Sequence, residues 1–366
     1  MLERNGHGGD LATAEELYGV PARQMLDYSA NINPLGPPPG LSDILAREWV
    51  SLTHYPDPES RELRRAIAQK YDVDFSSIVT GNGAAELIDL IARVLRPAKA
   101  AVIEPAFREY AEAAIKAGAD ILPVSASPEN GFSVPEEELL DACREADLMF
   151  IGQPNNPTGH WFSRKTLGRL MDTAQRYSTV IVADEAFLDF FENEQDLTLL
   201  REAANSKHLI VTRSMTKFYA IPGLRLGYAV THPDLVKTLK EMQVPWSVNH
   251  LAQAAGVFCL AQSSYETQTR QLIAQERSWL AHELREMDCL PFPGQANFML
   301  VRLGVDAPDA AIVQRILGLQ GILVRRCSGF KGLDDRYFRI AVRTRPENER
   351  LVSALRLALM GGREAG

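Results

Sequence analysis

Residues 180–187 read Val180-Ile-Val-Ala-Asp-Glu-Ala-Phe187, four apolar residues followed directly by two carboxylates. An unbroken apolar run of this kind is typical of a strand buried on both faces of a parallel sheet. In open α/β sheets, ligands lie beyond the carboxyl ends of the strands. The stretch therefore predicts a buried strand that places Asp184 at a ligand-binding edge. Taken alone, Asp184 also has an ordinary explanation as a helix N-cap.

Further apolar runs of the same character lie between residues 75 and 231, separated by segments of helical period. This alternation predicts an α/β fold with a mostly parallel, seven-stranded sheet. A helix is predicted over residues 84–95, and Ser163 is a candidate N-cap for a helix at 167–177. The predicted strands cover residues 77–80, 100–104, 121–124, 148–152, 180–184, 209–213 and 226–230.

The pattern changes after Pro245. Residues 250–287 have a helical pattern, and residues 298–303, 322–327 and 337–342 resemble strands, which predicts a second, smaller α+β domain. The Pro-rich run at 33–40 excludes regular structure. We therefore expect an N-terminal arm (residues 1–45) that joins the small domain or a partner subunit, a large domain (46–245), and an interdomain helix with the small domain (246–366).

Composition excludes several classes of function. The 366 residues carry a net charge of −8, the wrong sign for a surface that binds nucleic acid or a membrane throughout. No apolar run approaches the length of a membrane span. The four cysteines are far apart and suggest neither disulfides nor a metal site, so a cytoplasmic protein is expected.

Three more segments follow predicted strands: Gly81-Asn-Gly-Ala-Ala-Glu86, Gln153-Pro-Asn-Asn-Pro-Thr-Gly159, and Ser214-Met-Thr-Lys-Phe218 with Gly223-Leu-Arg-Leu-Gly227. Each alone has an ordinary explanation as a turn, a loop or a surface lysine. Together with Asp184 they bring a phosphate-binding helix start, an amide, an amine and a carboxylate to one sheet edge. These are the groups that a pyridoxal 5′-phosphate site needs.

These motifs resemble those of the fold type I, class I/II aminotransferase family over nearly the whole chain. The resemblance implies a fold type I enzyme that uses pyridoxal phosphate. Within the family, the chain resembles decarboxylases of phosphorylated hydroxyamino acids in cobalamin synthesis more closely than histidinol-phosphate aminotransferases. The runs that carry the narrower match are His7–Gly9, Asp27–Gly36, Ser214–Gly227, Pro245–Asn249 and Tyr337–Arg343.

The resemblance implies a role for each cofactor residue. Lys217 would hold the cofactor through its amine, Asp184 would pair with the pyridine nitrogen, and Asn156 would bind the ring 3′-oxygen. Phe107 would lie over the ring. The cofactor phosphate would be bound by the backbone N–H groups of Gly83 and Ala84, the Ser214 hydroxyl, the Arg225 guanidinium, and Tyr55 from a partner subunit of a homodimer with shared active sites.

The substrate side is basic: residues 325–350 hold eight Lys and Arg against four Asp and Glu. A small phosphorylated amino acid would find its counter-charges there, although some of these arginines are expected to be ordinary surface residues. By family position Arg339 binds the carboxylate, and Arg325 is the candidate for the substrate phosphate. The other candidates are Arg343, His7, Asn31 and Asn33.

The residues leave the reaction itself open. Pyridoxal phosphate supports both decarboxylation and transamination, and the orientation of the substrate selects between them. Serine phosphate lacks only one methyl group of threonine phosphate, a difference worth about 1–3 kcal/mol in a pocket. A catalytically silent regulator is disfavoured, because residues 1–45 are too short and Pro-rich for a helix-turn-helix.

Overall fold

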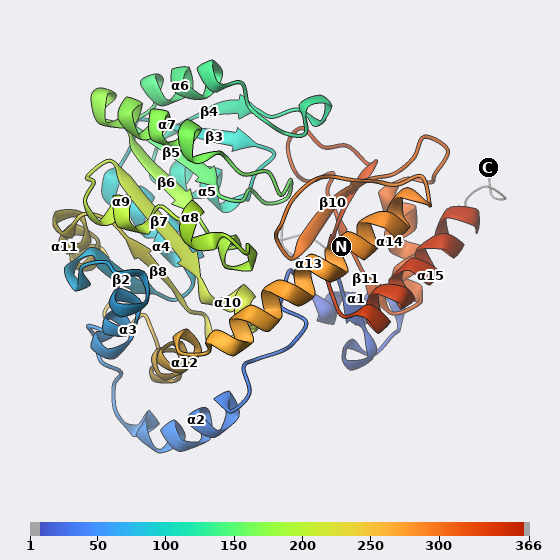
Figure 1. The fold of residues 1–366 in the computed structure, drawn as a ribbon, viewed down its shortest axis with the longest axis horizontal. Coiled ribbons are helices and arrows are strands. Elements are labelled where there is room, and N and C mark those ends of the chain that lie inside the picture. The colour runs from blue at the N-terminus through green and yellow to red at the C-terminus, as the bar shows by residue number, and fades with distance from the viewer. Residues whose placement is uncertain (1–7, 362–366) are drawn as a thin grey trace.

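A seven-stranded sheet forms the centre of the large domain in the computed structural model, which describes residues 8–361 (Figure 1). Strand β8 is antiparallel to both of its neighbours, and all the other adjacent pairs are parallel. In spatial order the strands are β2 (Ile78–Gly81), β8 (Gly227–Val230), β7 (Leu209–Ser214), β6 (Val180–Asp184), β5 (Leu148–Gly152), β3 (Lys99–Glu104) and β4 (Asp120–Ser125). The predicted α/β class with a mostly parallel seven-stranded sheet is confirmed.

Most predicted strand bounds agree with the structure to within about a residue. The runs 148–152 and 180–184 match β5 and β6 at both ends. Ser77 was expected in the first strand but belongs to a 3-10 turn over Phe75–Ser77. The Asp74 side chain caps this turn by accepting a hydrogen bond from the Ser76 backbone (2.6 Å). Local capping there takes precedence over the apolar pattern.

Helices cover both faces of this sheet and enclose two apolar cores. On one face pack α4 (Ala84–Leu95), α5 (Glu109–Lys116) and α11 (Pro233–Met242). On the other pack α3 (Arg61–Tyr71), α6 (Glu136–Glu145) and α7 (Arg164–Tyr177), while the short α8 (Glu194–Leu197) and α9 (Leu200–Ala204) connect β6 to β7. The predicted helix at 84–95 is confirmed, as is the Ser163 N-cap, whose hydroxyl accepts from the backbone of Thr166 (3.1 Å).

The small domain is built on an antiparallel sheet in the order β12 (Arg325–Arg326), β13 (Tyr337–Ala341), β10 (Phe298–Arg302), β9 (Leu290–Pro291). Helices α14 (Ala310–Leu319) and α15 (Arg345–Gly361) belong to it. The helical pattern at 250–287 corresponds to two helices, α12 (His250–Leu260) and α13 (Ser263–Arg285), and α13 runs from the large domain to the small one (Figure 1).

The N-terminal segment is attached to the small domain through a parallel strand pair. It contains α1 (Leu11–Tyr18), β1 (Leu26–Asp27) and α2 (Leu41–Glu48). Strand β1 pairs with β11 (Ile322–Leu323). This pairing divides the run 322–327, expected as one strand, because β11 joins β1 whereas β12 joins β13.

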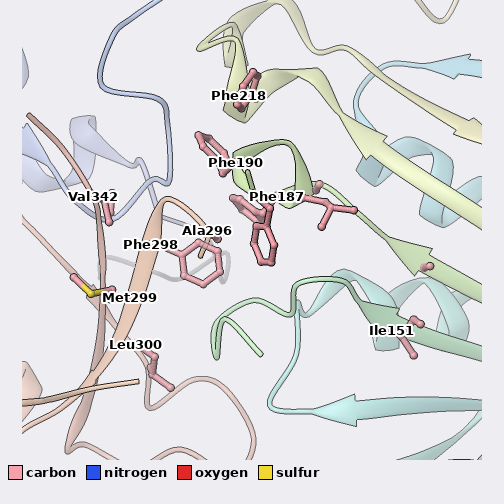
Figure 2. Close-up of a cluster of buried hydrophobic side chains, with 14 of the residues drawn as sticks. Ile151, Phe187, Phe190, Phe218, Ala296, Phe298, Met299, Leu300 and Val342 are labelled. Atoms are coloured by element: carbon pink, nitrogen blue, oxygen red, sulfur yellow. The ribbon is translucent and has the colours of Figure 1, made fainter. Parts of the chain in front are cut away.

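Aromatic side chains connect the two domains. Figure 2 shows Phe187, which follows β6, beside Phe298 of β10; the ring centroids are 4.9 Å apart and edge-to-face. Phe190 packs in the same way on Phe218 (5.0 Å), at the end of the short helix α10 (Met215–Phe218). The segments after β6 and β7 are therefore fixed against each other and against the small-domain sheet.

Within residues 8–361, no helix is long and apolar enough to cross a membrane, and no three His, Cys, Asp or Glu side chains are grouped to hold a metal ion. All four cysteines are buried, and none of them forms a disulfide.

Candidate active site

A cavity of about 440 Å³ lies at the carboxyl ends of β5, β6 and β7, where the two domains and the N-terminal segment meet. Five cationic side chains and two carboxylates line it, so the cavity is basic in a chain that is acidic overall. Its walls are formed by Gly8, Ser29, Ala30, Asn31, Ala84, Ala85, Ile88, Phe107, Arg108, Glu109, Tyr110, Pro154, Asn156, Asp184, Ala186, Phe187, Ser214, Thr216, Lys217, Arg225, Arg325, Phe330 and Arg339.

Lys217 reaches the cavity from α10, directly after β7. Its removal from bulk water, and then the positive charges of Arg339 and Arg225, lower the pKa of the ammonium from 10.5 to about 8. A larger fraction of the side chain is therefore the neutral amine near pH 7 than for an exposed lysine. The neutral amine is the form that attacks a carbonyl carbon.

Asp184 ends β6 with its carboxylate at the cavity wall. Its Oδ1 accepts hydrogen bonds from the Thr212 hydroxyl (3.0 Å) and the Ala186 backbone (3.2 Å), and its Oδ2 accepts from the Tyr110 hydroxyl (2.7 Å). Burial raises the pKa of this carboxyl, and the three hydrogen bonds oppose that rise. A carboxylate offers about four acceptor positions, so one remains for a ligand.

A buried ion-pair cluster holds the ends of β6 and β7 together behind the site. Arg213, the residue before Ser214, donates to Glu185, the residue after Asp184 (2.9 Å). It also donates to Asp189 (2.9 Å) and Glu194 (2.7 Å). The backbone positions of Asp184 and Ser214 are therefore fixed relative to one another by interactions outside the cavity.

A cradle for an anion forms where α4 begins. Ala84 and Ala85 lie at the cavity, together with Arg225 and the hydroxyls of Ser214 and Thr216, which are 2.7 Å apart. Helix N-termini, hydroxyls and a guanidinium are favourable partners for phosphate.

Gly83 does not supply the N–H group expected of it, because that N–H donates to the Gly81 carbonyl (2.8 Å). Its contribution is space. A Cβ atom at Gly83 would lie 2.2 Å from Arg225 Nη2, and the φ of +86° also favours glycine. Only glycine lets the guanidinium reach the cradle in this position.

Asn156 and Arg339 connect the large domain to the small domain across the cavity. Arg339 Nη1 donates to Asn156 Oδ1 (2.5 Å), and its Nη2 donates to the Ser29 carbonyl (2.5 Å). Arg339 thus contacts the Asn156 loop and the N-terminal segment at once. The three parts of the chain that enclose the cavity are joined by this one side chain.

Arg325 and Asn31 complete the substrate end. Arg325 is directly opposite Arg339 in the antiparallel β12–β13 pair, and its guanidinium carbon is 5.7 Å from the centre of the Phe330 ring. The Oδ1 atom of Asn31 is buried and has no hydrogen-bond partner among the described residues. It is an acceptor at the cavity wall.

Phe107 lines the cavity, and its ring meets that of Tyr110 edge-to-face at 5.6 Å. Sequence reasoning missed Tyr110, as well as Thr216 and Ser29. Tyr110 lies on the first turn of α5, and its closeness in sequence to Phe107, which precedes that helix, was the available local signal.

Two expected substrate residues lie outside the cavity. Asn33 Nδ2 lies within hydrogen-bonding distance of the Phe218 carbonyl (2.8 Å), the Tyr265 hydroxyl (2.9 Å) and the Thr269 hydroxyl (2.8 Å). Arg343 donates to the Asp27 carbonyl (3.1 Å) and pairs with Glu347 (2.7 Å). Both side chains are occupied in holding the N-terminal segment in place, which corrects the expectation that they line the substrate pocket.

Two further residues cannot be placed at this cavity. Tyr55 is 80% exposed and stacks on Trp246 (4.6 Å between centroids), in a separate groove. It does not reach the cavity of its own chain. His7 lies outside the described residues, and Gly8, which follows it, lines the cavity.

The donors present fit pyridoxal phosphate. An amine, an ionisable carboxyl with an open acceptor position, and a phosphate cradle that a Cβ at Gly83 would obstruct surround one space. Lys217, Asp184, Asn156 and Phe107 would then contact the ring, and Ala84, Ser214 and Arg225 would contact its phosphate.

Residues 23–355 match the sequence family of class I and class II aminotransferases, so this chain belongs to that family.

Among individual proteins, the chain is 36% identical to the threonine-phosphate decarboxylase of Salmonella typhimurium over 362 residues, 98% of each chain. The crystal structure of L-threonine-O-3-phosphate decarboxylase from Porphyromonas gingivalis superposes with a TM-score of 0.79 at 26% identity, covering 91% of this chain and 99% of that one. That of histidinol-phosphate aminotransferase from Clostridium acetobutylicum gives a TM-score of 0.86 at 30% identity, covering 92% and 100%.

Proposed function

We propose that this protein is a pyridoxal-phosphate-dependent carboxy-lyase that converts L-threonine O-3-phosphate into CO₂ and (R)-1-amino-2-propanol O-2-phosphate, the amino-alcohol phosphate of the cobalamin side chain. Support comes from its similarity to the Salmonella decarboxylase over 98% of both chains. The charge and layout of the cavity support the same substrate class.

The main structural support for the proposal is that Arg325 and Arg339 face each other. They occupy directly facing positions on β12 and β13, and both are buried at the cavity. Like charges directly opposite each other in a sheet are destabilising, so the pair favours an anionic ligand between or beside them. Because the phosphate cradle at Arg225 is needed by the cofactor, a substrate with both a carboxylate and its own phosphate accounts for the two extra arginines.

The residues have distinct tasks in this reaction. When bound, pyridoxal phosphate accepts into its ring the electron pair of a bond broken at the substrate Cα. Arg339 binds the substrate carboxylate, and Arg325 binds the phosphate and so fixes the pose in which the carboxylate is lost. Lys217, which reaches the cavity from α10, supplies a proton to Cα after CO₂ leaves.

The functional unit in this proposal is a cytoplasmic homodimer with shared active sites. Tyr55 does not reach the cavity of its own chain and is exposed, which suits a role for Tyr55 of the partner subunit at the cofactor phosphate. A symmetric dimer is the commonest soluble oligomer. Four reduced thiols fit a reducing compartment.

Histidinol-phosphate transamination is the second candidate, because the Clostridium aminotransferase structure superposes with a TM-score of 0.86. Its substrate is also a phosphorylated amine. It differs in needing a keto acid to accept the amino group.

The test is to incubate the cofactor-loaded protein with L-threonine O-3-phosphate, L-serine O-phosphate or histidinol phosphate, each with and without 2-oxoglutarate. We expect CO₂ and the phosphorylated amine from threonine phosphate, independent of the keto acid. A serine-phosphate rate equal to or above the threonine-phosphate rate would reassign the substrate. Turnover of histidinol phosphate only when 2-oxoglutarate is present would establish the second candidate.

A further inference from the structure

Within residues 8–361, the hydrogen bonds to Asp184 all come from neutral groups. The Thr212 hydroxyl and the Ala186 backbone occupy Oδ1, and the Tyr110 hydroxyl occupies Oδ2 at 2.7 Å. A cation in any of these positions would neutralise the carboxylate. Neutral donors favour the ionised form and fix its orientation, yet leave its negative charge available to a cationic partner in the cavity.

Tyr110 is the donor with the most restricted geometry. Its side chain is 2% exposed, and its ring stacks on Phe150 of β5 with centroids 5.3 Å apart and ring planes 1° from parallel. Burial and the neighbouring Asp184 raise the pKa of the phenol well above its usual value, so the hydroxyl keeps its proton and remains a donor. Because the ring cannot turn without losing the stack, the hydroxyl stays directed at Oδ2.

The same ring also positions Phe107. The Tyr110 backbone N–H donates to the Phe107 carbonyl (3.1 Å), and the two rings meet edge-to-face. One side chain therefore contacts the carboxylate expected at the cofactor ring nitrogen and the aromatic ring expected over the cofactor plane. These two groups come from different segments of the chain, and Tyr110 fixes their relative position.

We propose that Tyr110 is a positioning residue that acts through Asp184: it holds Oδ2 as an ionised acceptor for the cofactor ring nitrogen and so keeps that nitrogen protonated. The inference rests on the proposed function, because it presupposes pyridoxal phosphate in the cavity. Tyr110 itself need not contact the reacting atoms.

The test compares Tyr110→Phe with Tyr219→Phe. Tyr219 is the matched control, because its buried hydroxyl also donates to a carboxylate, Glu266, at 2.7 Å but does not line the cavity. Four quantities are measured on each holoenzyme: the visible absorbance of the lysine-bound cofactor as a function of pH, kcat, KM for threonine phosphate, and the thermal unfolding midpoint. The apparent dissociation constant of the cofactor is measured as well.

We expect Tyr110→Phe to raise the midpoint of the absorbance titration by about one pH unit, since a hydrogen bond to a charged group contributes on the order of 1.5 kcal/mol. A protonated ring nitrogen would lower the pKa of the nitrogen that links Lys217 to the cofactor. When the ring nitrogen is less protonated, that pKa, and with it the titration midpoint, should rise. We expect kcat to fall about tenfold with KM nearly unchanged. Tyr219→Phe should leave the midpoint and kcat as in the wild type, although both variants lose some thermal stability.

If the midpoint of the absorbance titration does not move in a folded, cofactor-loaded Tyr110→Phe protein, the inference is overturned while the proposed function remains intact. Absence of visible absorbance in the wild type would instead refute the proposed function. If Tyr110→Phe does not fold, Thr212→Val removes another neutral donor to Asp184 and should raise the midpoint in the same direction. An unmoved midpoint in Thr212→Val would then overturn the account.

Discussion

The carbonyl oxygen of Lys217 accepts a hydrogen bond from the backbone N–H of Asn33, at 3.0 Å. A residue of the N-terminal segment is thus attached to the backbone of the lysine expected to hold the cofactor. The Asn33 side chain reinforces this contact by donating to the carbonyl of Phe218, the next residue after Lys217. The N-terminal segment, through Asn33 and Asn31, both fixes Lys217 and forms part of the cavity wall.

Asn33 and Asn31 are predicted to have separable effects. Asn33→Ala removes the four hydrogen-bond contacts of a buried side chain and should lower the free energy of unfolding by about 2 kcal/mol. Asn31→Ala removes an acceptor that has no partner within residues 8–361, so stability should change by less than about 0.5 kcal/mol while KM for threonine phosphate rises. Denaturant unfolding and steady-state kinetics on both variants measure this. Equal losses of stability in the two would contradict the assignment.

The depressed pKa of Lys217 predicts a pH-dependent destabilisation of the cofactor-free protein. The ammonium has a pKa of about 8 when folded against 10.5 as an unperturbed side chain. Between these values the unfolded chain binds more protons, so stability rises with pH; below about 8 the destabilisation is constant. Lys217→Met should therefore be more stable than wild type at pH 7, by on the order of 1–3 kcal/mol.

That advantage should shrink as the pH rises from 8 toward 10. The measurement is urea unfolding of both apoproteins across this range. A difference independent of pH would mean that the substitution acts through packing and not through the charge.

Gly83→Ala is predicted to weaken cofactor binding by displacing Arg225. The added Cβ would lie 2.2 Å from Nη2 at a φ of +86°. Loss of a charge-assisted contact to phosphate should raise the cofactor dissociation constant by at least about tenfold. Gly118→Ala is the control, because its φ is +92° but no atom lies within 4 Å of the added Cβ. If both variants bind the cofactor equally well, the cradle does not depend on space at Gly83.

The strands, and the side chains at their ends, were predictable because their signals are local. An apolar run ending in Asp184, or a hydroxyl-rich segment holding Lys217, determines the position of its residues from a few neighbours and the common edge of a parallel sheet. Asn33 and Arg343 could not be placed in this way, since their partners Phe218 and Asp27 are distant in sequence.

Tyr110 was missed for the same physical reason. Its role depends on Asp184, which is 74 residues away. The division of residues 322–327 into β11 and β12 also depends on a distant partner, because β11 pairs with β1. The sequence predicted an N–H donor at Gly83; in the structure that N–H donates to Gly81, and the missing Cβ leaves space for Arg225.

Arg325→Gln is predicted to impair substrate binding without impairing cofactor binding. The side chain is 4% exposed at the cavity and faces Arg339, and loss of one charged contact to a substrate anion should lower kcat/KM about 10- to 100-fold. The cofactor dissociation constant should not change, because Arg325 lies on the small-domain side. Arg343→Gln serves as the control and should affect stability more than KM, since Glu347 already neutralises Arg343. If kcat/KM instead fell in Arg343→Gln and stayed unchanged in Arg325→Gln, the substrate phosphate would be assigned to Arg343.

The most direct test of the central claim is the number of CO₂ molecules released per subunit from L-threonine O-3-phosphate when no keto acid is present. A decarboxylase regenerates its lysine-bound cofactor in every cycle, so we predict many turnovers per subunit, an equal yield of the phosphorylated amine, and no turnover by Lys217→Met. Absence of CO₂ release, together with amino-group transfer that stops after one equivalent until 2-oxoglutarate is added, would contradict the account and make the protein an aminotransferase.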